Sequence, residues 1–407
     1  MEVFRRLSLD AEVTTKNSTS TFSIIETGAL YACGDNSSGQ LGIGDNQRRL
    51  TMQKVLLEES AKVVESGDDF TYVLTRSGAL YACGYNGFGQ LGLGDNMNRS
   101  ILQRVHLEER VKMIAVGGYS LFVLTVSGAL YACGYNSYGQ LGLGDSQDRS
   151  TLQRVPLEER VRTVVAGNGS TYVLATNGAL YTCGYNWYGQ LGLGDSQDRS
   201  TLRRVSLEES VKTVVIADAS LYVITVSGTL YACGNNYYAR LGLGDIWSRS
   251  ILTKTPLEES VETVVARNSC LYVVAVSGTL YACGYNSFGQ LGLGGDSSQS
   301  TLVRVPLEVS VKMVVVSNSS AYFLATNGAL YACGYNGYGR LGLGDLLSRK
   351  TLTRVPLIER VKTLGIGERS VLVTTVNGAL YACGDNEYGQ LGLGDNTTRT
   401  VFTVVTY

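Results

Sequence analysis

The chain has 407 residues, of which 44% are hydrophobic and 17% are charged, so it can bury a large core and falls outside the disordered class. Its 34 basic and 35 acidic side chains leave a net charge of −1 without a basic stripe, which argues against a nucleic-acid partner. No apolar run approaches the roughly 20 residues that span a bilayer, and Arg5 and Arg6 stand where a signal peptide needs apolar residues, so we expect a cytoplasmic or nuclear protein with no membrane partner, not a secreted one.

A single unit repeats along the whole chain. The octapeptide Gly-Ala-Leu-Tyr-Ala-Cys-Gly-Tyr recurs eight times, with small changes, at a period of 50 residues and without insertions. A fixed period of this size indicates an array of one supersecondary unit. We therefore expect one domain over residues 1–407, with repeats centred on strands at 28–34, 78–84, 128–134, 178–184, 228–234, 278–284, 328–334 and 378–384.

Within one repeat the pattern predicts four short strands. Residues 151–155, 161–165, 171–175 and 179–183 are alternating or β-branched runs, and Asn177-Gly178 is the dipeptide preferred in a two-residue hairpin turn. Residues 184–195 are too rich in glycine for a helix. Four antiparallel strands per repeat are typical of a propeller blade, so we expect an all-β, closed propeller.

The two ends of the chain bear on closure of the ring. Residues 5–10 resemble residues 203–208, and residues 401–405 repeat the same strand type. That strand therefore occurs nine times, against eight copies of the other three. One terminal copy is expected to complete the last blade, and the other to overlap it or fray.

The nine cysteines do not suggest disulfides or a metal site. Eight occupy one repeat position, Cys270 is the exception, and no CxxC pair or Cys–His cluster exists. Equivalent positions of packed sheets lie about 10 Å apart, whereas a disulfide needs Cα atoms within about 7 Å. We expect reduced, buried core residues, and neither a metal nor a cofactor.

The repeat motif resembles that of a known family. Gly189-Gln-Leu-Gly-Leu-Gly-Asp195 and its seven counterparts are similar to the repeat of the regulator of chromosome condensation family over essentially the whole chain. The resemblance implies a ring, seven-bladed in that family. Eight blades are expected here, with seven and a displaced repeat as the alternative. The family's plant ultraviolet photoreceptors use clustered tryptophans, whereas this chain has only Trp187 and Trp247, so light sensing is not expected.

The loops that replace the family's Gly-x-x-His element vary most between repeats. Since binding residues typically lie on loops held by a rigid scaffold, these loops supply the candidates for partner binding. In the exchange-factor members of the family this face contacts the GTPase Ran through acidic and histidine residues. By resemblance Asp69 falls on an acidic position, and Phe70 replaces the histidine. The candidates are Asp68, Asp69, Phe70, Tyr119, Asp218, Arg267, Glu368 and Arg369.

We expect structural roles for the other distinctive polar and aromatic residues. His106, the only histidine, has no partner in the sequence and is expected to be exposed. Glu158-Glu159 and their counterparts lie in polar turns and are expected to be solvated. Asp195 and Arg199 recur as a pair and are lost together in the sixth repeat, as Gly295 and Gln299, which suggests contact; a local rearrangement around Asp296 is the alternative. The aromatic residues after the cysteine strand are expected to pack between blades, with an exposed aromatic crown as the alternative.

These observations favour a non-enzymatic, monomeric propeller that binds a partner protein through the variable loops of one face. The alternative is a guanine-nucleotide exchange factor for a Ran-like small GTPase. Such exchange factors use an inserted β-wedge, and the constant period leaves no room for one in this chain.

Overall fold

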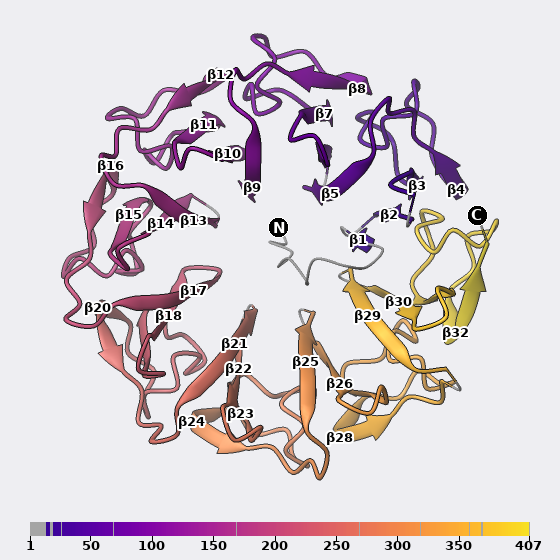
Figure 1. Cartoon of the computed structure of the whole chain (residues 1–407). Helices are drawn as coiled ribbons and strands as arrows, with labels where there is room; N and C mark the ends of the chain where they lie inside the picture. Colours follow the sequence, from indigo (N-terminus) through magenta and orange to yellow (C-terminus); the bar gives the residue numbers. More distant parts are fainter. Residues whose placement is uncertain are drawn as a thin grey trace.

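The computed structural model describes residues 14–16, 19–25, 27–67, 69–167, 169–267, 269–317, 319–357, 359–367 and 369–406. Within these ranges the chain forms strands and no helix, arranged as eight four-stranded antiparallel sheets. The sheets are arranged radially around a central axis, as the blades of a propeller (Figure 1). The prediction of an all-β propeller is confirmed with eight blades, so the seven-bladed alternative is wrong.

Each blade runs outward from the axis through four strands in chain order. The first strands are β1 (Thr14–Lys16), β5 (Ala61–Ser66), β9 (Val111–Gly117), β13 (Val161–Ala166), β17 (Val211–Ala217), β21 (Val261–Arg267), β25 (Val311–Val316) and β29 (Val361–Ile366). The second strands are β2 (Ser20–Ile24), β6 (Phe70–Thr75), β10 (Ser120–Thr125), β14 (Ser170–Ala175), β18 (Ser220–Thr225), β22 (Cys270–Ala275), β26 (Ser320–Ala325) and β30 (Ser370–Thr375). The third strands are β3 (Leu30–Gly34), β7 (Leu80–Gly84), β11 (Leu130–Gly134), β15 (Leu180–Gly184), β19 (Leu230–Gly234), β23 (Leu280–Gly284), β27 (Leu330–Gly334) and β31 (Leu380–Gly384). The outer strands are β4 (Arg49–Lys54), β8 (Arg99–Val105), β12 (Arg149–Arg154), β16 (Arg199–Arg204), β20 (Arg249–Lys254), β24 (Gln299–Arg304), β28 (Arg349–Arg354) and β32 (Arg399–Val405).

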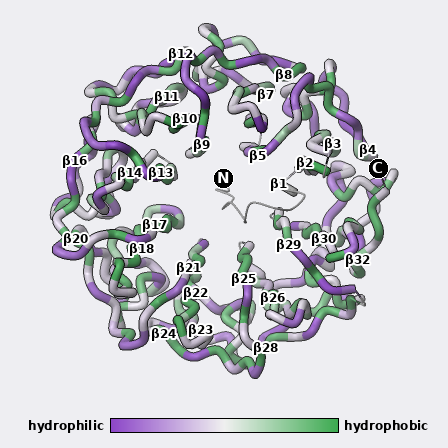
Figure 2. Tube along the Cα trace, in the orientation of Figure 1, coloured by the Kyte–Doolittle hydropathy of each residue, from purple (hydrophilic) through white to green (hydrophobic). Residues whose placement is uncertain are grey.

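Burial follows the position of a strand in its blade. Every residue of β14 is buried, as in the other second strands, whereas the outer strand β16 is half-buried or exposed throughout. A second strand is covered on both faces by neighbouring blades, so it contains an almost continuous apolar run. Hydrophobic residues accordingly recur in every blade around the ring (Figure 2). The strands predicted at 151–155, 161–165, 171–175 and 179–183 are β12, β13, β14 and β15, within two residues.

The predicted two-residue turn at Asn177-Gly178 is wrong. Ala175 N donates to Ala179 O at 2.9 Å, and Gly178 N donates to Ala175 O at 3.1 Å, so the loop contains three residues. Gly178 has a φ of +83°, whereas Asn177 has no positive φ. A two-residue type I′ turn requires a positive φ at both positions, but a type I turn followed by a glycine bulge requires it only at the glycine.

The cysteine row lies at the junctions between neighbouring blades. All nine cysteines are free and buried, as predicted. Cys183 lies against the preceding blade, where its Sγ donates to Gln140 O at 3.4 Å. A Cβ at Gly142 of that blade would lie 3.3 Å from the same sulfur, so a small side chain fits the space between the two sheets. Burial raises the pKa of the Cys183 thiol and that of Cys270, the latter to about 12.

Because reactivity follows thiolate content and exposure, we expect native protein at pH 8 to leave all nine cysteines unmodified by a thiol reagent such as DTNB. The same reagent should modify all nine in guanidinium chloride. The measurement is the absorbance of the released thiolate before and after unfolding. Rapid modification of any cysteine in the native state would show that two blades separate at that position.

The first and last blades close the ring directly. Gly394 N donates to Leu50 O at 2.9 Å, and Thr21 Oγ1 donates to Gln390 O at 2.7 Å. Cys33 and Met52 of the first blade share a hydrophobic cluster with residues of the last blade, including Leu391. β32 completes the last blade, as one of the two predicted outcomes for the terminal strands, and the other copy at residues 5–10 lies outside the described residues.

Candidate partner-binding face

Two sets of loops lie on the same face of the ring. The second strand β14 begins, and the third strand β15 ends, at this face, where Tyr185 N donates to Gly169 O at 2.7 Å. The corresponding bond in the second blade joins Tyr85 N to Asp69 O, also at 2.7 Å. We define the loop face as residues 67, 69 and 85–98 together with the described equivalents of these residues in the other blades. The structure therefore brings the predicted binding loops together on one surface.

In the second blade the candidates differ in exposure. Asp69 is half-buried at the edge of the loop face, and Asp68 lies outside the described residues. The placement of Phe70 among the partner contacts is contradicted, because its side chain is 1% exposed. A Cβ at Gly67 would lie 2.3 Å from Phe70 Cζ, so the absence of a side chain at Gly67 leaves room for this ring. The buried ring of Phe70 therefore packs against the backbone of the loop at Gly67.

Tyr119 joins the second and third blades. Its ring centroid lies 5.9 Å from that of Phe70, 5.8 Å from that of Tyr85 and 5.0 Å from that of Phe88. The ring is half-buried, so one part packs on its neighbours and another part faces solvent. Pairs of this kind contribute about 0.5–1.5 kcal/mol beyond their buried area. Tyr119 thus combines a packing role with an accessible surface.

Asp218 is exposed but carries an internal partner. Its Oδ2 accepts a charged hydrogen bond from Arg240 Nη1 at 2.8 Å, and Arg240 is only 5% exposed. The other end of the guanidinium donates to Ser269 Oγ of the next blade at 3.1 Å, from Nη2. Asp218 has a φ of 49°, a left-handed conformation that Asp tolerates better than most residues. Asp218 is therefore part of a blade-to-blade network on the loop face.

The remaining candidates lie on the sixth and eighth blades. Arg267 is half-buried and donates from Nη1 to Val316 O of the seventh blade at 3.3 Å. Arg369 is exposed, and its guanidinium carbon lies 4.9 Å from the ring centroid of Tyr338. Such a cation–π contact at an exposed site contributes about 0.5–1 kcal/mol. Glu368 lies outside the described residues.

Aromatic residues of the loop face pack across the blade junctions, as expected. The ring centroids of Phe88 and Tyr135 are 5.1 Å apart, and those of Tyr138 and Tyr185 are 5.0 Å apart. Phe288 and Tyr335 make a similar contact at 5.2 Å. Several of these rings also keep an exposed edge. The packing interpretation is confirmed, and it leaves part of the aromatic surface accessible.

The predicted contact between the recurring Asp and Arg is confirmed in seven blades. In the second blade Arg99 Nη2 lies 2.6 Å from Asp95 Oδ2, while the Met97 amide donates to Asp95 Oδ1 at 2.9 Å. The Met97 amide and the Arg99 guanidinium together hold the pKa of Asp95 below its usual range. In the sixth blade, where Gly295 and Gln299 replace the pair, Asp296 instead binds Lys350 Nζ at 2.6 Å. The pair fixes the loop conformation.

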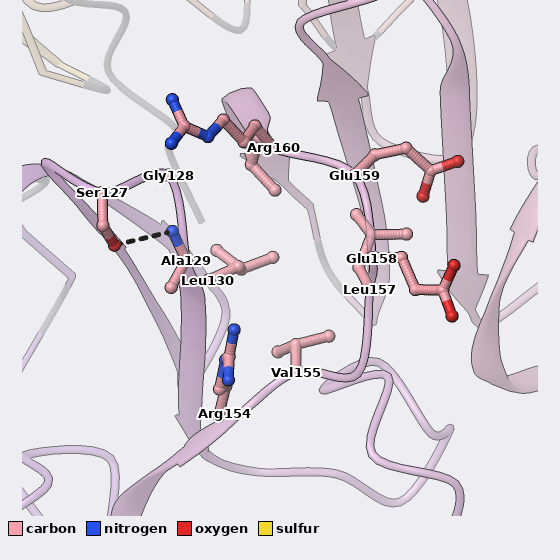
Figure 3. A pocket seen from close by; sticks show the side chains of 11 residues that line it. Ser127, Gly128, Ala129, Leu130, Arg154, Val155, Leu157, Glu158, Glu159 and Arg160 are labelled. Atoms are coloured by element: carbon pink, nitrogen blue, oxygen red, sulfur yellow. Dashed lines mark hydrogen bonds between the residues drawn. The ribbon is translucent and has the colours of Figure 1, made fainter.

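The opposite face carries shallow hollows that repeat with the chain. One hollow lies between residues 127–130 and 154–161, and Ala129 N donates to Ser127 Oγ at its edge (Figure 3). A second hollow lies one blade further on, lined by the equivalent residues 177–180 and 204–211. A hollow that recurs at equivalent residues follows from the repeat itself. It gives no sign of a site peculiar to one blade.

The expectation that both glutamates of each pair on that face are solvated is confirmed for only one of the two. Glu158 is exposed, but the second glutamate of each described pair accepts a hydrogen bond from at least one hydroxyl group. Glu109, for example, accepts from Tyr131 Oη at 3.3 Å and from Ser127 Oγ. The Ser127 hydrogen bond is the main reason that the pKa of Glu109 lies below its usual range. His106 is exposed, as predicted.

Several distinctive residues of the loop face were missed in the sequence. Arg240 and Arg340 stand where six other repeats have glutamine, and Ala239 stands where the other seven have glycine. Both arginines are buried, and Arg340 lies 5.4 Å from the ring centroid of Tyr338. Departure from the repeat at a buried loop position is a signal that the sequence did contain.

The described residues contain no helix long and apolar enough to cross a membrane.

Comparisons with known proteins agree with this geometry. The family model of the RCC1-like domain matches residues 7–248 and 153–406. No curated protein matches the sequence closely enough to count as a relative. Among solved structures, human WBSCR16 is similar with a TM-score of 0.69 and 20% identity, covering 85% of this chain and 99% of that one.

Yeast RCC1 (Prp20) bound to Kap60 is similar with a TM-score of 0.64 and 18% identity, covering 83% of this chain and 84% of that one. A second structure of Prp20p from Saccharomyces cerevisiae, described with its binding to Gsp1p and histones, has a TM-score of 0.63 and 19% identity, with 82% and 87% covered. These likenesses concern the fold. Taken with the repeat motif and the family match over both halves of the ring, they lead to one conclusion: the chain belongs to the RCC1-like domain family.

Proposed function

We propose that this protein is a non-enzymatic interaction propeller whose loop face binds a partner protein. The observation that carries the proposal is the contrast within the repeat. The strands hardly change from blade to blade, whereas the loops that carry Asp69, Tyr119, Asp218, Arg267 and Arg369 differ in charge and size and meet on one surface. A rigid ring with variable loops on one face is suited to recognition.

The test compares two quadruple variants. Asp68, Asp69, Glu368 and Arg369 are replaced by alanine in one, and the exposed Glu58, Glu108, Glu158 and Glu208 of the opposite face are replaced in the other. Protein captured from the native cell by the unmodified chain is identified, purified and titrated against both variants. We expect the loop-face variant to lose binding with a nearly unchanged melting temperature, and the opposite-face variant to bind normally. Equal binding by both variants would contradict the proposal.

Exchange activity on a Ran-like GTPase is the second candidate. It is supported by family membership and by Asp69 at the edge of the loop face, and the structural relative Prp20p is described with its binding to Gsp1p. The described blades keep the constant period and show four strands each, without an added hairpin. The assay is release of labelled GDP from a panel of small GTPases. Acceleration at micromolar protein would favour this candidate, and its absence would leave the binding function alone.

A further inference from the structure

The two tryptophans of the chain lie on neighbouring blades and are both exposed. Trp187 of the fourth blade is 70% exposed, and Trp247 of the fifth blade is 71% exposed. Four further large side chains of the same two loops are also exposed, by 39–68%. We define the aromatic patch as Trp187, Tyr188, Tyr237, Tyr238, Ile246 and Trp247. All six belong to the loop face.

Contacts between the two blades place these residues side by side. A Cβ at Gly189 would lie 2.4 Å from Ser250 Cα, and Leu193 forms a β-bridge with Ile251. The loop of Trp187 therefore rests on the chain segment that follows Trp247. Within the fifth blade the ring centroids of Tyr237 and Tyr238 are 4.8 Å apart.

Equivalent positions elsewhere in the ring also lie close to each other. Arg48 Nη1 donates to Glu387 O at 3.1 Å across the closing junction, where these residues correspond to Ser248 and Trp187. Within the first blade Asn46 Nδ2 donates to Ser37 O at 3.3 Å, at the positions of Ile246 and Tyr237. The loops that carry the patch are therefore neighbours across the junction between the fourth and fifth blades.

The fold does not require these side chains. The position of Trp187 holds serine, glycine or glutamate in six of the other blades, and that of Trp247 holds glutamine, serine or threonine in five. Those blades form the same four strands. Surface clusters of large apolar residues usually mark an interaction site.

Backbone strain coincides with the patch. Asp218, Tyr238 and Ala239 have φ values of 49°, 73° and 59°, and they are the only non-glycine residues with positive φ in the described parts of the chain. All three belong to the fifth blade. Strained residues of this kind cluster at binding sites, where the surrounding structure maintains them.

The size and chemistry of the patch point to one kind of partner. Large side chains bury about 150–250 Å² each, so the exposed fractions offer roughly 600–800 Å², close to the share of one partner in a standard interface. None of the six side chains is charged, and the nearby Asp245 and Arg249 pair with each other. The polar atoms of the patch are tyrosine hydroxyls and indole N–H groups, which donate hydrogen bonds.

We propose that the aromatic patch binds a proline-rich segment of the partner protein in the polyproline II conformation. Such a segment presents apolar pyrrolidine rings and backbone carbonyls without internal hydrogen bonds, which match exposed rings that carry donors. An amphipathic helix satisfies its own carbonyls and leaves those donors without acceptors. This inference rests on the proposed function, since it names the partner class for one sector of the loop face.

The two tryptophans provide a direct readout, because all indole fluorescence of the protein comes from the patch. Titration with a decaproline peptide is expected to give a saturable blue shift of the emission. Trp187→Ala and Trp247→Ala should each weaken the affinity by at least about tenfold, as expected for aromatic hot spots. Leu347→Ala provides the matched control, because Leu347 occupies the position of Trp247 on the seventh blade and is 68% exposed. Its affinity should be unchanged.

Three results would overturn the inference. These are no shift with decaproline at millimolar concentration, a shift with an amphipathic helical peptide but not with decaproline, and a shift on concentrating the protein alone, which would identify a second copy as the occupant. Circular dichroism of each variant separates lost binding from lost folding. A failed peptide titration alongside intact, loop-dependent capture of a partner would remove this inference and leave the proposed function standing.

Discussion

Replacement of Gly184 by alanine is expected to lower the free energy of unfolding by at least about 3 kcal/mol. Gly184 ends the third strand with a φ of +96°, and its counterparts in the other blades are all glycines with similar angles. A Cβ at Gly184 would lie 2.1 Å from Gly169 O. That carbonyl accepts the Tyr185 amide at 2.7 Å, so it cannot move away without loss of a hydrogen bond. Chemical denaturation monitored by circular dichroism measures the loss.

Gly194→Ala separates the two causes of this effect. Gly194 has a comparable φ of +93°, but the nearest atom to its added Cβ would be Ile251 Cγ2 at 3.8 Å. Only the left-handed conformation should therefore cost stability at this position, by about 1–2 kcal/mol. If both variants lost the same stability, the close approach of the two loops at Gly184 would be refuted.

Asp218→Asn is expected to lower the free energy of unfolding by about 2 kcal/mol. The substitution keeps a residue that tolerates positive φ, and it removes the charge that faces the buried Arg240 at 2.8 Å. Removing one partner of a buried ion pair typically costs about 3–5 kcal/mol, and the 44% exposure of the Asp218 side chain reduces that figure. Chemical denaturation of the full chain provides the measurement.

The double variant Asp218→Asn/Arg240→Gln supplies the control for this pair. Glutamine is the residue of six other blades at the position of Arg240, so the double variant restores the common arrangement without a buried charge. It should recover most of the stability lost by Asp218→Asn alone. If the two substitutions lowered stability additively, the ion pair would have no energetic role.

Most of the fold could be predicted from the sequence, because the same pattern occurs eight times. The period set the number of blades, and the alternation within residues 151–183 located four strands to within two residues. The prediction of a two-residue turn at Gly178 was wrong because an Asn-Gly pair fits both a type I′ turn and a type I turn followed by a glycine bulge. The hydrogen bond from Gly178 N to Ala175 O distinguishes the two. The role of the terminal strands stayed open because both ends of the chain carry the same strand pattern.

The shared position of the candidate loops on one face could be predicted from the sequence, but the surroundings of each candidate residue could not. The variable loops gather on one face because all of them connect the same two strands of a blade. The burial of Phe70 depends on the space left at Gly67 and on Tyr119 from the next blade, which lies far away in the sequence. The partner of Asp218 belongs to a different loop. The sequence does indicate this partner, because Arg240 stands where six other repeats have glutamine, but the difference is visible only when the repeats are compared.

Closure of the ring is tested most directly by amide hydrogen exchange at eight equivalent inter-blade bonds. Gly44, Gly94, Gly144, Gly194, Gly244, Gly294, Gly344 and Gly394 each donate an amide to a carbonyl of the adjoining blade, at 2.8–2.9 Å. The first seven join blades that are consecutive in the chain, and only Gly394 spans the closing junction. A closed ring predicts that the Gly394 amide is protected as strongly as the other seven. Fast exchange at Gly394 alone would show an open array and would contradict a continuous loop face.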